Sequence, residues 1–496
     1  MHVIDPQGHT RRAFLRRSGA LAMAGSAMPF AMTLAAMGEA AAQSAPGDDY
    51  KALVCVFLFG GCDYGNTVIT YDDASHAKYT AIRVAQASGG IAIAKDALAA
   101  TALTPSTALP DGRQYALHPS MTAMKAMFDA GTAAVQLNVG PLVIPLNRAL
   151  YNNGNKKLYP VPPKLFSHND QQSTWQSSRP EGSTVGWGGN IGDIVLGGNT
   201  NSLFTCISVA GNAVFLSGDH ALQYQVGTGG AVKINSMSGT GSVFGSTKVR
   251  EAMSLLTQKT RAHTLENEYG VVTTRAVNAE GQVNGAIGTP FTFGASGDYP
   301  DTGLHRQLGM VARLIRGRTS LGARRQVFFV SLGGFDLHDN LIARQGPLLQ
   351  QLSQSISDFH TKMLPADVAG KVTTFTASDF GRTLSSNGDG TDHGWGSHHF
   401  IAGGAVKGGA IYGAPPPVSV ENKSGLEGYD GHVGQGRLIP TTSVDQYGAT
   451  MGKWFGLNDA QLLEILPNLS NFGAGSIDIG GVSHSYPRDV GFMKPA

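Results

Sequence analysis

The chain contains short runs of apolar and β-branched residues, which is the pattern of strands buried on both faces of a parallel sheet. The clearest runs are residues 51–59, 133–139, 326–332 and 371–377. Between them, apolar residues recur at helical spacing and predict helices over 119–130, 302–316 and 347–363. Pro347 is expected in the first turn of the last helix, where proline is tolerated. The recurring strand–helix–strand order predicts an α/β fold with a mostly parallel sheet.

A long segment interrupts this alternation. Residues 203–217 predict further strands and 246–268 predict a helix, whereas 270–300 carry little helical or strand signal. The sequence has no internal repeat and no interdomain linker. We therefore expect one domain over residues 43–496, with a large insertion at about 180–300.

The first forty-odd residues have the pattern of an export signal. Arg11 and Arg12 form a twin-arginine pair, an alanine-rich apolar stretch follows over 18–37, and small residues occupy 40–42. A membrane anchor is the alternative, but the stretch is rich in Ala and Gly and no stop-transfer charges follow it. We expect a Tat signal peptide over 1–42, recognition by the Tat export machinery, and a periplasmic or secreted mature protein without a stable membrane span.

The amino-acid composition limits the classes of binding partner that are expected. Charged residues are 15% of the chain and the net charge is +2, so nucleic acid is not an expected partner. A hydrophobic content of 42% is enough for a full core, and 66 glycines indicate many tight turns. The three cysteines cannot form a disulfide framework. Cys62 follows the first predicted strand, and a buried small side chain is favoured there over a ligand or nucleophile.

Carboxylates and imidazoles follow two of the predicted strands. Asp336 and His338 come after a Gly-Gly turn, and alternate residues of an extended chain share a face, so both are candidate metal ligands. The alternative is that Asp336 caps the next helix and His338 packs nearby. Asp379, after the following strand, is a candidate ligand or a helix cap. Arg382 is a candidate catalytic residue that would bind an oxyanion through two guanidinium N–H groups.

The glycine-rich segment after Asp379 carries the densest set of ligand-type residues: Asp392, His393, His398 and His399. Zinc and manganese accept mixed Asp/His sets, while harder ions such as calcium prefer oxygen. Two adjacent histidines usually point to opposite sides, so one of the His398–His399 pair need not be a ligand. We expect Asp392, His393 and His398 in the metal set, with His393 and His398 favoured, and one or two ions of zinc, manganese or calcium.

Two other loops could complete the site. Asp63, in GGCD after the first strand, is either a ligand from the opposite side or a turn residue, and Asn66 could add an amide contact. The segment SHNDQQSTW (167–175) offers Ser167, His168, Asp170, Ser173 and Thr174. Ser167 or Thr174 is the candidate catalytic nucleophile, because a metal ion can activate a hydroxyl by direct coordination.

The order of these motifs resembles a known family. GGCD, Leu117-His118-Pro119, SHND, LGGFDLH, SDFGRT, NGDGTDHG and the trailing GRLIPTTSVDQYGAT resemble the Tat-exported proteins of domain of unknown function 1501, over nearly the whole mature chain. That family is distantly similar to the alkaline phosphatase and sulfatase superfamily. The resemblance implies a doubly wound α/β sandwich with helices on both faces and a two-metal site. By position, it implies as ligands Asp63, Asp336, His338, Asp379 and either His393 or His398.

The chain departs from that superfamily in two places. The nucleophile pattern C/S-x-P-x-R is absent, and the residue after Asp379 is Phe380 rather than histidine. We expect an exported metal-dependent hydrolase of phosphate or sulfate esters, acting on a small molecule or a polymer. The alternative is a non-catalytic envelope or binding protein that keeps the fold and one metal. An oxidoreductase is disfavoured, because the chain has neither a cysteine cluster nor a dinucleotide-binding glycine pattern.

Overall fold

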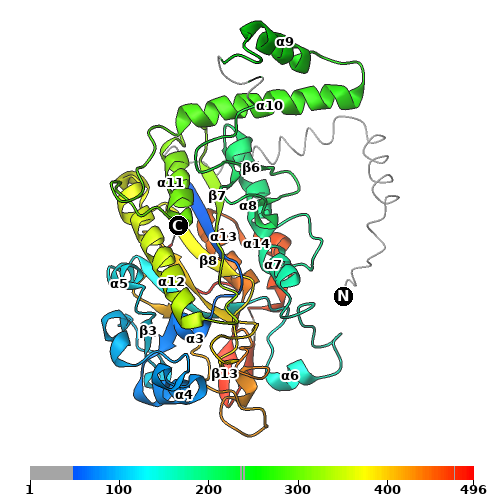
Figure 1. Cartoon of the computed structure of the whole chain (residues 1–496). Coiled ribbons are helices and arrows are strands. Elements are labelled where there is room, and N and C mark those ends of the chain that lie inside the picture. The colour runs from blue at the N-terminus through cyan, green and yellow to red at the C-terminus, as the bar shows by residue number, and fades with distance from the viewer. Residues whose placement is uncertain (1–48, 235–236, 238–240, 474, 496) are drawn as a thin grey trace.

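A nine-stranded mixed sheet forms the centre of the computed structural model (Figure 1), which describes residues 49–234, 237, 241–473 and 475–495. The strand order is β10-β4-β9-β8-β1-β7-β5-β6, with β11 also paired to β4. The strands are β1 (Lys51–Leu58), β4 (Ala133–Gly140), β5 (Cys206–Ser208), β6 (Gln223–Gln225), β7 (Arg325–Leu332), β8 (Val372–Ser378), β9 (Ser397–Ala402), β10 (Ile411–Tyr412) and β11 (Thr442–Ser443). The predicted signal peptide over 1–42 lies outside the described residues.

Most strands of the sheet run parallel. β1 pairs in parallel with both β7 and β8, and β5 pairs in parallel with β6 and β7. Only β9 runs against its neighbours β4 and β8. Two separate antiparallel pairs are β2 (Val68–Thr70) with β3 (Tyr115–Leu117), and β12 (Ser476–Ile479) with β13 (Val482–Ser485). The predicted α/β class with a mostly parallel sheet is confirmed.

Helices cover both faces of the sheet (Figure 1). α5 (Thr122–Asp129), α11 (Gly303–Arg316) and α12 (Leu341–Asp358) contribute to one core, and α7 (His168–Ser177), α8 (Trp187–Val195), α13 (Val444–Phe455) and α14 (Asp459–Ile465) contribute to the other. The other α-helices among the residues described are α3 (Tyr64–Thr67), α4 (Asp73–Arg83), α6 (Arg148–Asn152), α9 (Thr247–Gln258) and α10 (Thr264–Ala286). Among the residues described, no helix has both the length and the apolar character that crossing a bilayer requires.

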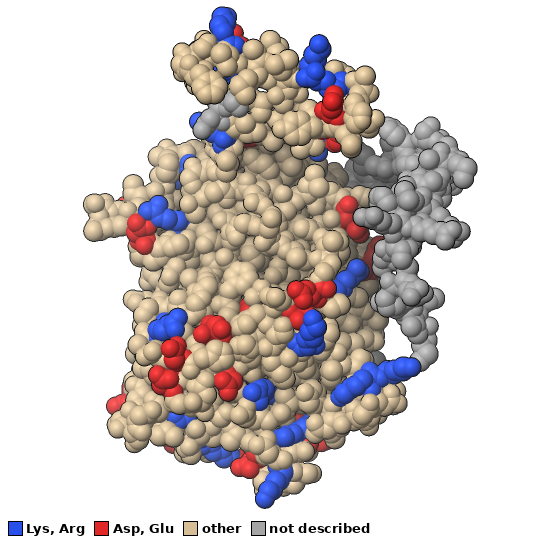
Figure 2. Space-filling model, turned by 45° about the vertical axis from the view of Figure 1, so that its right-hand side comes forward, with Lys and Arg blue, Asp and Glu red and all other residues tan. Residues whose placement is uncertain are grey.

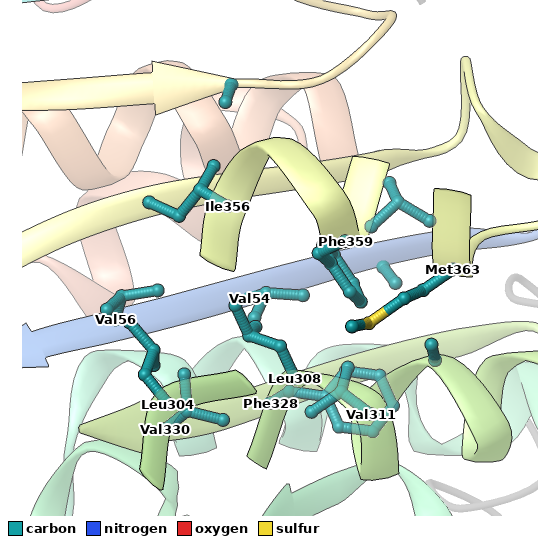
Figure 3. Close-up of a cluster of buried hydrophobic side chains, with 14 of the residues drawn as sticks. Val54, Val56, Leu304, Leu308, Val311, Phe328, Val330, Ile356, Phe359 and Met363 are labelled. Carbon is teal, nitrogen blue, oxygen red and sulfur yellow. The ribbon is translucent and has the colours of Figure 1, made fainter. Parts of the chain in front are cut away.

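The side chains of β1 alternate between the two cores. Val54 and Val56 belong to the α11–α12 side, and Cys55 and Phe57 to the side of α8 and α13. Figure 3 shows Val54 and Val56 packed with side chains of β7, α11 and α12. Because each face of the strand is buried, the sequence of β1 is apolar at every position but the first rather than at alternate positions.

Two helix predictions are wrong in their limits. The helix predicted over 246–268 is two helices, α9 and α10, and α10 continues through the region predicted to lack structure. Its β-branched residues 271–274 disfavour a helix, but Ala279 and Val283 are buried in the core and hold the second half of α10 in place. α12 begins at Leu341, so Pro347 lies inside the helix rather than in its first turn.

Candidate metal centre

Three side chains from distant parts of the chain converge at one edge of the sheet. His168 is the first residue of α7, Asp336 follows β7, and His393 lies in the loop between β8 and β9. One ligand-type atom from each lies within 4.8 Å of those from the other two. This edge is where the parallel strands β1, β7 and β8 end, the usual place for a site in an open α/β sheet.

The ring of His168 is held by Asp379. Nδ1 lies 2.6 Å from Asp379 Oδ2, and because a carboxylate can only accept, Nδ1 carries the proton. The other nitrogen, Nε2, then faces Asp336 Oδ2 at 3.4 Å. Asp379 is fully buried just after β8, and it also accepts hydrogen bonds from Gln172 Nε2 (2.8 Å) and the Gly60 amide (3.2 Å).

The ring of His393 is held in the same sense. Its Nδ1–H donates to the Phe166 carbonyl at 2.7 Å, so Nε2 is unprotonated and lies 3.2 Å from Asp336 Oδ1. Phe166 has a φ of 75°, a conformation that bulky residues rarely adopt and that is found where function over-determines the backbone. Here it accompanies a carbonyl that fixes the tautomer of His393.

His338 stands beside these three residues and is 45% exposed. Its Nε2 lies 3.0 Å from His393 Nε2 and 3.1 Å from Asp336 Oδ1, and its Nδ1 lies 3.3 Å from Asp392 Oδ1. The Nε2 atoms of three histidines therefore gather around one carboxylate, each with Nδ1 turned to an acceptor. Histidines that bind a metal are oriented by acceptors of this kind. The lone pairs of the Nε2 atoms and of the carboxylate point to one place, where a cation would bind, so these residues fit a divalent ion.

Arg382 holds Asp336 in place. The guanidinium is fully buried, and its NH1 donates to Asp336 Oδ1 at 2.6 Å and to the Gly60 carbonyl at 3.1 Å. Nε donates to Thr391 Oγ1 at 3.2 Å, and NH2 donates to the Thr391 carbonyl. Every nitrogen of Arg382 is thus engaged inside the protein. Arg382 positions Asp336, and the expected role as an oxyanion ligand does not fit its surroundings.

Gly60 lies so close to the backbone of Asp336 that no side chain would fit there. It has a φ of 115°, and a Cβ at this position would lie 2.3 Å from the Asp336 backbone nitrogen. Its amide and carbonyl contact Asp379 and Arg382 respectively, so one residue links both supports of the site. The glycine predicted to follow the first strand is therefore required for backbone approach.

The surroundings shift the pKa values of the three converging residues in different directions. The hydrogen bond to Asp379 raises the pKa of His168, whereas burial lowers the pKa of His393. Burial acts to raise the pKa of Asp336, but the Arg382 hydrogen bond and charge outweigh it and lower that pKa overall. Asp336 is therefore ionised at neutral pH. The raised pKa of His168 favours a second proton on Nε2, the nitrogen that faces Asp336. A metal ion bound at Nε2 would displace that proton.

Asp63 is not brought to this cluster as a free ligand. Both of its oxygens lie 2.6 Å from the guanidinium of Arg83, which is fully buried. Asp63 also accepts from the Gly65 amide at the start of α3. The Asn66 Oδ1 accepts from Arg83 and from Tyr79, so the amide proposed as a further contact belongs to the same internal network.

Two other predicted residues lie in the body of the sheet. His398 is buried in β9, where its Nδ1 accepts from the Asn138 amide at 3.1 Å, and burial lowers its pKa to about 3. His399 is buried on the same strand, and its ring meets Trp175 edge-on. Cys62 is also buried, and burial raises its pKa to about 12, which leaves it a neutral thiol. None of these three side chains belongs to the cluster of His168, Asp336 and His393.

The two candidate nucleophiles have partners within α7. Ser167 Oγ donates to Asp170 Oδ2 at 2.9 Å, and Thr174 Oγ1 donates to the Asp170 carbonyl at 2.7 Å. His168, which belongs to the cluster, is among the residues offered by the SHND segment but is not in the predicted metal set. In the sequence it has no neighbouring histidine and does not follow a predicted strand, so the SHND motif is the signal that could have identified it.

The fold and these residues define a class: α/β proteins with a candidate His/Asp metal centre where parallel strands end. The chain belongs to the family described as protein of unknown function (DUF1501), whose model matches residues 50–466. That range contains every residue of the candidate centre. A search of curated proteins found no match to the chain.

Proposed function

We propose that this protein is an exported metal-dependent hydrolase that cleaves phosphate or sulfate esters with one divalent ion. The ion would be held by His168, Asp336 and His393, with His338 next to them. The observation that carries the proposal is the shared orientation of the imidazoles, whose Nδ1 atoms all face acceptors while their Nε2 atoms meet at Asp336. A His₂-carboxylate set with an open position is typical of catalytic zinc.

The donor set favours zinc or manganese over calcium, because calcium takes six to eight oxygen ligands. It also favours one ion. The alkaline phosphatase resemblance implies a two-metal site with Asp63 among its ligands, but in this chain Arg83 neutralises Asp63. Arg83 is a permanent cation at that position.

A bound divalent ion would act as a Lewis acid that polarises the ester. It would also lower the pKa of bound water toward neutrality, so that hydroxide is available near pH 7. The hydroxyls of Ser167 and Thr174 are committed to Asp170, so water is the attacking group we propose. His338 is the exposed imidazole of the set, and Asp392 orients it. We assign it the acceptance of a proton from the attacking water and the transfer of that proton to the leaving group.

A second candidate is a non-catalytic binding protein that keeps the metal. Arg382 favours it, because the one arginine expected to hold the substrate anion is buried and fully engaged. In both cases the twin-arginine segment over 1–42 would direct export to the periplasm or beyond.

The test is metal analysis of the purified chain, followed by hydrolysis assays with aryl phosphate and aryl sulfate esters. We expect about one equivalent of zinc or manganese, lost in His168→Ala and in His393→Ala. The matched control is His220→Ala, an exposed histidine outside the cluster. Folded protein that binds no divalent ion would refute both candidates, and one bound ion without turnover of any ester would favour the binding protein.

A further inference from the structure

Exposed apolar side chains are concentrated in one part of the molecule. Among the described residues, 11 of the 17 large hydrophobic side chains that are exposed fall within 222–272. They are Leu222, Val232, Phe244, Val249, Met253, Leu255, Leu256, Leu265, Tyr269, Val271 and Val272. A concentration of this kind marks an interaction surface rather than ordinary surface variation.

Most of them lie on the α9–α10 arm, the two helices that project from the body of the protein at the top of Figure 1. The second half of α10 is anchored, because Ala279 and Val283 are buried in the core. The first half of α10 and the whole of α9 extend away from it. None of the residues of α9 is buried.

α9 presents its apolar face to solvent. Val249, Met253 and Leu256 are spaced i, i+4, i+7 and are 37%, 37% and 59% exposed. The positions that are partly covered are instead 250, 254 and 257, which carry Arg, Ser and Thr. α9 lies close against α10 on this side, since a Cβ at Gly270 would lie 2.8 Å from the Thr257 carbonyl oxygen. An amphipathic helix packed by its polar side leaves its apolar side for another partner.

The exposed half of α10 carries a matching stripe. Leu265, Tyr269 and Val272 again follow the i, i+4, i+7 spacing, and they are 74%, 70% and 49% exposed. Two adjacent helices of one arm therefore each present an unpaired apolar row. Rows of this form on two antiparallel helices are what pairs of helical hairpins bury when they form a four-helix bundle.

The charges on the arm indicate which partner this is. Lys259 and Arg261 follow α9 at the tip, and Glu266 and Glu268 lie in the first two turns of α10. Figure 2 shows basic and acidic side chains together on this projecting part. Two positive and two negative residues at one tip are self-complementary, whereas an anionic membrane would favour a basic surface.

We propose that the α9–α10 arm binds the arm of a second copy of this chain. A two-fold arrangement that lays α9 of one copy on α10 of the other buries both apolar rows. It also brings Lys259 and Arg261 of one copy to Glu266 and Glu268 of its partner. The interface is isologous, so its two halves are equivalent.

The first test is the mass of the purified full chain in solution, measured by light scattering over a concentration series. We expect a dimer, and we expect Leu256→Glu to raise its dissociation constant by about 30-fold or more, because it buries an unpaired charge. The matched control is Leu158→Glu, at 60% exposure against 59% for Leu256 and away from the arm. A monomer at every concentration, or a dimer that tolerates Leu256→Glu, overturns the proposal.

The second test uses charge reversal. One variant carries Lys259→Glu and Arg261→Glu, and another carries Glu266→Lys and Glu268→Lys. Each tip alone then has a single sign and should be mostly monomeric, whereas an equimolar mixture should recover the dimer. Circular dichroism checks that both variants fold. Failure of the mixture to associate, or binding of monomeric wild type to anionic phosphatidylserine vesicles, overturns pairing between copies.

Discussion

Replacing Asp379 by asparagine should weaken metal binding while leaving every proposed ligand in the chain. Asp379 is fully buried and accepts three hydrogen bonds, from His168, Gln172 and Gly60. Asparagine has a single acceptor oxygen. Whichever way its amide is turned, its NH₂ group faces an N–H that the carboxylate had satisfied. The orientation of His168 and the basicity of its Nε2 both suffer.

Loss of a residue that orients a metal ligand typically costs 10- to 100-fold in metal affinity, which is about 1.4–2.7 kcal/mol. The 2.6 Å contact and the complete burial place Asp379→Asn toward the upper end. The assay is competition for zinc against a chromophoric chelator of known affinity. Circular dichroism and urea unfolding establish that the variant is folded, since the unsatisfied donor also lowers stability by roughly 1–3 kcal/mol.

Asp170→Asn is the control for this measurement. Asp170 is a buried carboxylate of α7, the helix that carries His168, but it pairs with Ser167 and Lys164 instead of a ligand of the site. We expect its zinc affinity to stay within about threefold of wild type. Unchanged affinity in Asp379→Asn, or an equal loss in Asp170→Asn, would refute the assignment of Asp379 as the residue that orients His168.

Three other outcomes concern stability and are measured by urea unfolding. Arg83→Met leaves Asp63 buried without its partner and should lower the free energy of unfolding by about 3–5 kcal/mol, part of which Asp63→Asn in the same chain should restore. Burial lowers the pKa of both His398 and His399 to about 3, so each stays neutral when folded but binds a proton when unfolded below about pH 6.5. The free energy of unfolding should be highest above that pH and should be lower by about 2 kcal/mol per histidine at pH 5. The decrease should be smaller in His399→Gln, and a free energy that does not change with pH would contradict the prediction. Leu308→Ala, in the core shown in Figure 3, should cost about 2–5 kcal/mol, and a change below 1 kcal/mol would mean that the site collapses around the cavity.

The strands and the residues directly after them could be predicted from the sequence. A run such as 326–332 is buried on both faces, which leaves no alternative pattern, and Asp336 follows it by a short glycine turn. Asp336 and His393 are both in the predicted metal set and both lie in the cluster. Local pattern is sufficient here because the strand end and the ligand are only a few residues apart.

The remaining part of the site depends on contacts that local sequence does not contain. Asp63 follows its strand in the same way as Asp336, but Arg83, twenty residues later, pairs with it inside the protein. His398 belongs to a dense histidine segment, yet the strand β9 takes it away from the loop that holds His393. His168 reaches the cluster only because α7 is placed against β8, a relation between segments some two hundred residues apart.

The position of β1 has a consequence for how the chain is made. β1 is the first strand of the sheet to be synthesised, yet its two neighbours begin at Arg325 and Val372. While the ribosome is still producing the intervening segment, this apolar strand has two open edges and no partner. Such long-range pairing makes folding slow, and the exposed strand favours aggregation. A fragment that ends before β7 should therefore be insoluble, and β1 can gain both of its neighbours only once nearly four hundred residues have been translated.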